Sequence, residues 1–155
     1  MADYLPPHDG LLPKWLFFVS AVSAINSIQC YISPNYASQL YNADQSEGDS
    51  RNPNRTHQNN ANSKTPISAA TPLSSRTFGT WTFLSAVIRM YAAFHIYDPL
   101  VFEIAQWTYG IALLHFVSEW LVFGTAKAQG RFLGPLIVAT SSLVWMTLQK
   151  GWYTS

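Results

Sequence analysis

The fold of this chain is decided by apolar runs without charge, and the first of them lies at residues 15–32. It reads WLFFVSAVSAINSIQCYI, and no Asp, Glu, Lys or Arg follows it before Asp44. A helix that crosses about 30 Å of hydrocarbon needs roughly 20 mostly apolar residues. The run has nearly that length, and Lys14 is the only cation before it. Without a basic leader it is typical of a retained anchor rather than a cleaved signal peptide.

Three further runs of similar length follow, at residues 78–97, 100–123 and 132–149. Asp98-Pro99 between the first two of these predicts a tight turn, because proline disfavours continuation of the preceding helix. Charged residues make up only 11% of the chain, against about 25% in soluble domains. We therefore predict an all-α polytopic membrane protein, one domain over residues 1–155 with four transmembrane helices in a small bundle. The alternative is a soluble bundle of wholly buried helices.

A polar segment, residues 42–72, separates the first two spans. It is rich in Asn, Ser, Asp and Pro and has no aromatic residue, a composition that predicts a disordered, solvent-exposed loop. It contains one glycosylation sequon at Asn54, which matters only in a lumenal loop. Six Lys and Arg lie in the predicted loops on this side of the membrane and two on the other. That imbalance predicts a cytosolic loop and an unused sequon.

Several classes of function are excluded by what the sequence lacks. A net charge of +1 does not give the basic surface of a nucleic-acid-binding protein. The single cysteine, Cys30, cannot form an intrachain disulfide, and no Cys/His spacing resembles a zinc site. The sequence has no GxGxxG, nucleophile elbow, P-loop or HExxH, and too few histidines for a membrane di-iron site. We predict a protein without catalytic activity, metal or cofactor.

Small and polar residues recur at helical spacing on three of the spans. They are Ser20, Ser23, Ser27 and Cys30 on the first span, Ser85, Ala86, Ala92 and Ala93 on the second, and Ala105, Thr108, Ala112, His115 and Glu119 on the third. Such faces allow close approach of helices in membranes. They therefore predict helix–helix contacts, either within the bundle alone or also with helices of other membrane proteins.

Charged residues inside the spans are costly, about 2.5–3.5 kcal/mol each on insertion scales. Arg89 lies too deep for a surface charge, and Glu103 could reach it across the Asp98-Pro99 turn. We predict that they form a buried ion pair with a structural role. His115 and Glu119 share a helix face at i and i+4, but one His and one Glu make an incomplete metal site.

Particular strings in the chain resemble a known family. They are PLSSRTFGTWT at residues 72–82, Arg89 with Tyr91, WTY at 107–109, HFVSEW at 115–120 and GPL at 134–136. The chain resembles a fungal member of the ergosterol biosynthetic protein twenty-eight family over all four spans. The loop from residue 42 to residue 70 looks longer than the family pattern requires.

The resemblance implies a non-catalytic, multi-pass protein of the endoplasmic-reticulum membrane that serves as a scaffold in ergosterol biosynthesis. The implied partners are the sterol C-4 methyl oxidase, the C-3 sterol dehydrogenase/decarboxylase and the 3-ketosteroid reductase, with a link to the sterol C-24 methyltransferase. Membrane lipid surrounds such a protein, and assembly into a homo-oligomer stays open.

A docking surface for helices of those enzymes is expected where the second span enters the membrane. Our hypothesis assigns it Arg76, Trp81, Arg89, His115 and Glu119. Two alternatives use the same four helices. A sterol-binding or sterol-transfer protein would enclose a lipid groove, and a small transporter or channel would use the intramembrane polar residues as a path.

Overall fold

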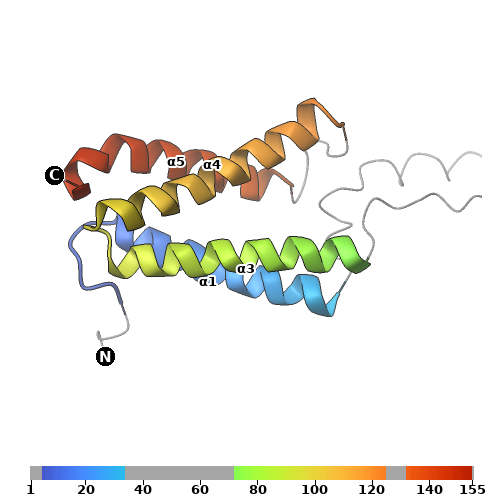
Figure 1. Cartoon of the computed structure of the whole chain (residues 1–155), viewed down its shortest axis with the longest axis horizontal. Coiled ribbons are helices and arrows are strands. Elements are labelled where there is room, and N and C mark those ends of the chain that lie inside the picture. The colour runs from blue at the N-terminus through green and yellow to red at the C-terminus, as the bar shows by residue number, and fades with distance from the viewer. Residues whose placement is uncertain (1–4, 34–71, 125–131, 155) are drawn as a thin grey trace, which may run out of the picture.

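The computed structural model describes residues 5–33, 72–124 and 132–154, and within them every element of regular secondary structure is a helix. The helices are α1 (Leu12–Ile32), α3 (Pro72–Phe94), α4 (Pro99–Leu121) and α5 (Leu133–Thr154). Successive helices run antiparallel to each other. In Figure 1 the α1–α3 pair lies below the α4–α5 pair. The closely packed pairs are α1 with α3, α4 with α5 and α3 with α4.

The four predicted spans coincide with the four helices, but some observed helix ends differ from the predicted ends. The helix α3 begins at Pro72 rather than residue 78, and α5 continues through Thr154, past the predicted end at residue 149. Charge and polarity mark where a chain leaves lipid, whereas a helix continues until its backbone hydrogen bonds stop. Apart from Pro72, the predicted disordered loop at 42–72 lies outside the described residues, and so does Asn54.

The predicted turn between α3 and α4 is confirmed. The carboxylate of Asp98 accepts hydrogen bonds from the backbone N–H groups of Leu100 at 2.9 Å and Val101 at 3.3 Å. Pro99 occupies the first helical position, where its missing N–H costs nothing and its fixed φ suits a helix. A tight hairpin therefore sets α3 and α4 side by side.

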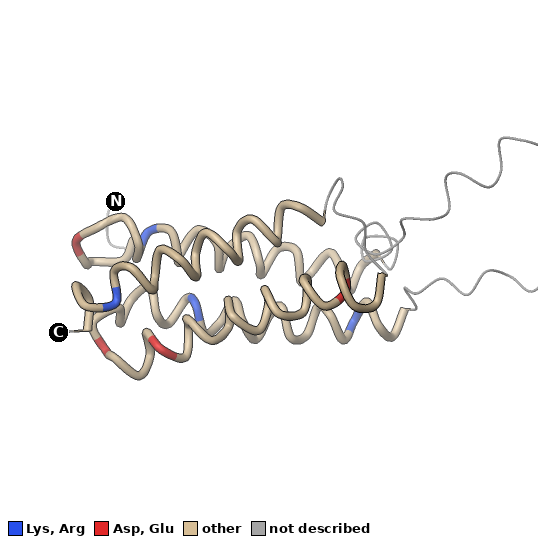
Figure 2. Tube along the Cα trace, turned by 90° about the horizontal axis from the view of Figure 1, so that it is seen from above, with Lys and Arg blue, Asp and Glu red and all other residues tan. Residues whose placement is uncertain are grey.

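The bundle buries many small and polar residues beside a core of large apolar ones, and it leaves many other large apolar side chains exposed. Its buried positions include Ser20, Ser27, Ser75, Ser142, Ala86, Ala92, Ala105 and Ala112. Its exposed side chains include Ile25, Ile28, Leu84, Ile104, Ile111, Leu114, Val144 and Leu148. Along most of the bundle the residues are uncharged, and charged positions gather mainly toward its two ends (Figure 2). This distribution is typical of helices that pack in lipid.

Two helices, α1 and α4, are long and apolar enough to cross a membrane. Only 28% and 33% of the residues in their apolar segments are buried. The core helix of a soluble protein would be mostly buried, so these exposed apolar faces favour a membrane protein over the soluble bundle. The small faces predicted from the sequence lie between helices, since Ser20, Ser27, Cys30, Ala105 and Thr108 are all buried.

The helices α1 and α3 approach each other closely at Gly79. The hydroxyl of Ser27 donates to the Gly79 carbonyl at 2.6 Å, and that of Ser75 donates to the Cys30 carbonyl at 2.8 Å. A Cβ at Gly79 would lie 3.0 Å from the Tyr31 ring and 3.1 Å from Cys30 Cβ. A side chain at this position would therefore push against Tyr31 and Cys30 of α1, which glycine avoids.

Replacing Gly79 with Leu is expected to lower the free energy of unfolding by about 1–3 kcal/mol, because the larger side chain overpacks the α1–α3 contact. Thermal unfolding in detergent, followed by circular dichroism, measures the change. Gly110→Leu is the matched control, because a Cβ there meets only the Trp107 ring at 4.0 Å. Equal melting temperatures for the two variants would contradict the prediction.

Candidate functional site

A cavity of about 400 Å³ lies between the two helix pairs and is lined by all four helices. Aromatic rings form much of its wall, namely Trp15, Phe18, Phe78, Trp81 and Phe116. On α1 the lining runs from Trp15 to Asn26, about 16 Å at 1.5 Å per residue. The volume falls within the usual range of ligand pockets, roughly 300–1,000 Å³. The cavity is therefore long, apolar and large enough for a small ligand.

At one end of the cavity, side chains of α1 and α5 touch each other. There the indole N–H of Trp15 donates to the Ser142 hydroxyl at 2.8 Å, and its ring packs near that of Trp145 at 6.3 Å. Farther along, small residues such as Ala112 and Ala139 face the gap. The cavity reaches the surface beside Phe18 and Val22, which are 58% and 40% exposed. Its opening is thus apolar.

Arg89 supplies the charge in this cavity. Its side chain lines the wall and is only 7% exposed. The Nε donates to the Thr108 hydroxyl at 2.9 Å and the Nη2 to the Thr108 carbonyl at 3.3 Å. The guanidinium also lies over the Tyr109 ring, 3.9 Å from its centroid, a cation–π contact. Three neighbouring groups on α4 therefore hold the cation at one end of the cavity.

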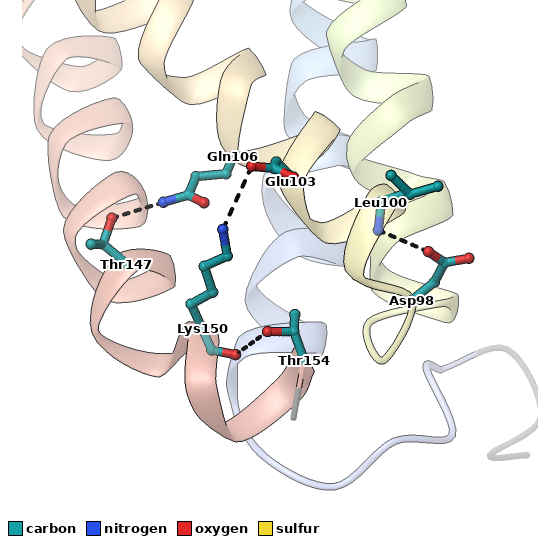
Figure 3. A network of polar contacts seen from close by, with 7 residues as sticks. All are labelled: Asp98, Leu100, Glu103, Gln106, Thr147, Lys150 and Thr154. Atoms are coloured by element: carbon teal, nitrogen blue, oxygen red, sulfur yellow. Dashed lines mark hydrogen bonds and ion pairs between the residues drawn. The ribbon is translucent and has the colours of Figure 1, made fainter.

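The predicted ion pair between Arg89 and Glu103 is wrong. Glu103 instead pairs with Lys150 of α5 at 3.6 Å, beside the hydrogen bond from Gln106 to Thr147 (Figure 3). Glu103 and Thr108 are five residues apart on one helix, which turns them roughly 140° away from each other. When Thr108 faces Arg89, Glu103 must point toward α5. This half-exposed pair (47% and 53%) contributes little stability if water reaches it.

The other four predicted docking residues lie in the first half of α3 and the second half of α4, away from Arg89. The Trp81 and His115 rings meet edge to face, with centroids 5.6 Å apart. Glu119 follows one turn later on α4 and is half-buried, while Arg76 is exposed in the second turn of α3. We call Arg76, Trp81, His115 and Glu119 the docking end. Arg89 is buried within the bundle, so the predicted five-residue set does not form one exposed surface.

The sequence did not point to the cavity or to Tyr109 as the partner of Arg89. One signal was present: Thr108 belongs to the predicted small face of α4, and a buried cation needs hydrogen-bond acceptors. Which acceptor Arg89 meets depends on how α3 and α4 are rotated about their axes. The sequence of neither helix alone determines that rotation.

A family model described as Erg28 like protein matches residues 12–144. The chain belongs to the Erg28 family. Ergosterol biosynthetic protein 28 of Candida albicans is 41% identical over 146 residues, covering 94% of this chain and 90% of that protein. The Saccharomyces cerevisiae protein of the same name is 44% identical over 146 residues, covering 94% and 84%. The family resemblance predicted from the sequence is confirmed.

Similarity extends beyond fungi over a shorter region. The Mus musculus homolog of ergosterol biosynthetic protein 28 is 47% identical over 74 residues, which is 48% of this chain and 53% of that protein. No solved structure matches the chain. Erg28-family proteins function in ergosterol biosynthesis, and their names state no catalytic activity.

Proposed function

We propose that this Erg28-family chain is a non-catalytic scaffold of the endoplasmic-reticulum membrane. It tethers the sterol C-4 methyl oxidase, the C-3 sterol dehydrogenase/decarboxylase and the 3-ketosteroid reductase, with the C-24 methyltransferase as a further partner. The observation that carries the proposal is the exposed apolar surface on every helix, which the bundle itself does not cover. In a membrane, such surfaces are available both to lipid and to helices of partner proteins.

All four helices cross the membrane in this proposal. The helices α3 and α5 have 23 and 22 residues, which is long enough to span about 30 Å. Their polar residues Arg89 and Ser142 are buried against other helices, while Leu84, Val87 and Leu148 are exposed. The outward faces of α3 and α5 carry apolar side chains beside exposed hydroxyl groups, such as those of Thr80 and Thr140, which donate to carbonyls of their own helix.

The docking end supports contact with partner helices. It combines the rings of Trp81 and His115 with a carboxylate and a guanidinium, all within the first three turns of α3 and the last two turns of α4. Polar groups near the membrane can hydrogen-bond across helices and specify which helix binds. A tether needs no catalytic residue, because holding several enzymes together raises their effective concentration for shared intermediates.

Affinity purification of the full chain from endoplasmic-reticulum membranes in mild detergent tests the proposal. We expect the three C-4 demethylation enzymes to co-purify in amounts comparable to the bait, as measured by quantitative mass spectrometry. The control bait is an unrelated four-span protein of the same membrane. Recovery of the chain alone, under conditions that preserve other membrane complexes, would contradict the scaffold.

A further inference from the structure

Arg89 presents a charged hydrogen-bond donor to the cavity. A guanidinium carries five N–H groups, and Arg89 donates one from Nε and one from Nη2 to Thr108. Its side chain also lines the cavity wall and lies over the Tyr109 ring. A guanidinium that faces an apolar cavity favours an oxygen acceptor that enters the cavity from outside.

The rest of the cavity fits a hydrocarbon body. Apart from Arg89 and a few hydroxyl and amide groups, its wall is aromatic and aliphatic. Its opening beside Phe18 and Val22 is apolar as well. In a membrane this opening meets acyl chains rather than water, so the ligand would enter from the bilayer. Water alone is a poor occupant of so large an apolar space.

We propose that the cavity binds one lipid molecule whose apolar body lies along α1 and whose single oxygen group accepts hydrogen bonds from Arg89. A sterol with a hydroxyl or ketone and a fatty acid with a carboxylate share this chemistry. The inference rests on the proposed location of the bundle in a membrane, but not on the tethering of enzymes. It gives the sterol-binding alternative a site, which the sequence did not.

Photolabelling of the full-length protein in phosphatidylcholine vesicles tests the site. One probe is a photoreactive sterol with a 3-hydroxyl group, and the second is a photoreactive fatty acid. We expect saturable labelling on cavity residues such as Trp81, Ala112 and Phe116, located by mass spectrometry. Competition by unlabelled sterol identifies a sterol as the ligand. Competition by unlabelled fatty acid identifies a fatty acid as the ligand. Labelling that never saturates and spreads over outward residues would overturn the site.

Filling the cavity should remove the labelling. Ala139 is 3% exposed and lines the wall, so Ala139→Phe is expected to reduce saturable labelling by about tenfold. Thr140→Phe is the matched control on the exposed neighbouring position. Gly134→Leu is a second filling variant with little risk of misfolding, because a Cβ at Gly134 meets no atom within 4 Å. Equal labelling in the filled and control proteins would overturn the proposal.

The role of Arg89 is tested with a probe that lacks the oxygen. Wild-type protein should prefer the 3-hydroxysterol over its deoxy analogue by about tenfold, the effect of a hydrogen bond to a charged group. Arg89→Met should lose this preference and still be labelled, which separates anchoring from a merely structural role. A preference retained in Arg89→Met would contradict the assignment. Carbonate extraction of the vesicles checks insertion separately, and these assays contain no partner enzymes.

Discussion

Replacing Glu119 with Leu is expected to weaken the association of the C-4 demethylation enzymes by at least about 30-fold. Truncating one member of a hydrogen-bonded charge pair at a buried interface costs about 2 kcal/mol or more, and each 1.4 kcal/mol is tenfold in affinity. Glu119 lies at the docking end, one turn beyond the His115 ring that contacts Trp81. Quantitative co-purification with tagged protein measures the loss.

The matched control for this prediction is Glu103→Leu. Both positions are glutamates on α4, but Glu103 lies at the other end of the bundle, half-exposed and paired with Lys150. Its replacement should leave enzyme recovery within about twofold, because exposed ion pairs contribute little. Arg76→Leu removes the guanidinium that α3 contributes to the docking end, and it should reduce enzyme recovery as Glu119→Leu does. If Glu119→Leu and Glu103→Leu gave the same recovery, the docking end would be the wrong surface.

Replacing Thr108 with Val is expected to lower the free energy of unfolding by about 1.5–3 kcal/mol. Valine keeps the shape of threonine but removes the hydroxyl that accepts from Arg89 Nε at 2.9 Å, and hydrogen bonds to charged groups are worth about that much. Unfolding in detergent micelles titrated with a denaturing surfactant gives the change. Thr147→Val on α5 is the control, since its bond to Gln106 is exposed and should cost less than about 0.5 kcal/mol.

The effect of Thr108→Val should largely disappear when Arg89 is removed first. Exchange of a buried ion for an apolar residue of similar volume is often neutral or stabilising, so Arg89→Met is expected to retain wild-type stability. In that background Thr108→Val should cost little, because no cation remains to lose its acceptor. The four proteins form a double-mutant cycle whose coupling energy isolates the contact. Additive effects of the two substitutions would contradict the importance of this contact.

The sequence predicted four helices, the Asp98-Pro99 turn and the residues that face other helices. These features are local: charge-free runs of membrane length, a proline after a capping residue and small residues at spacings of three and four. Each depends on neighbours within one or two helical turns. Helix ends were less well predicted at α3 and α5, because polarity marks the edge of lipid and not the last backbone hydrogen bond.

The partners of Arg89 needed the tertiary structure. Proximity along the chain favoured Glu103, but a residue five positions away on α4 faces a different neighbour. Each step of one residue rotates a side chain by about 100° around the helix, so the rotation of α4 about its own axis decides which of its residues meets Arg89. Thr108 and Tyr109 hold the cation because their side of α4 faces α3.

By itself, then, the sequence determined the family, the helical class and the faces that approach one another, because these follow from local periodicity and from motifs that can be read along the chain. Only the tertiary structure decided that α1 and α5 meet at Trp15 and Ser142 but separate beyond, leaving a cavity with Arg89 at one end. A cavity forms where the side chains of several packed helices leave space unfilled, so the sequence of a single helix does not predict it.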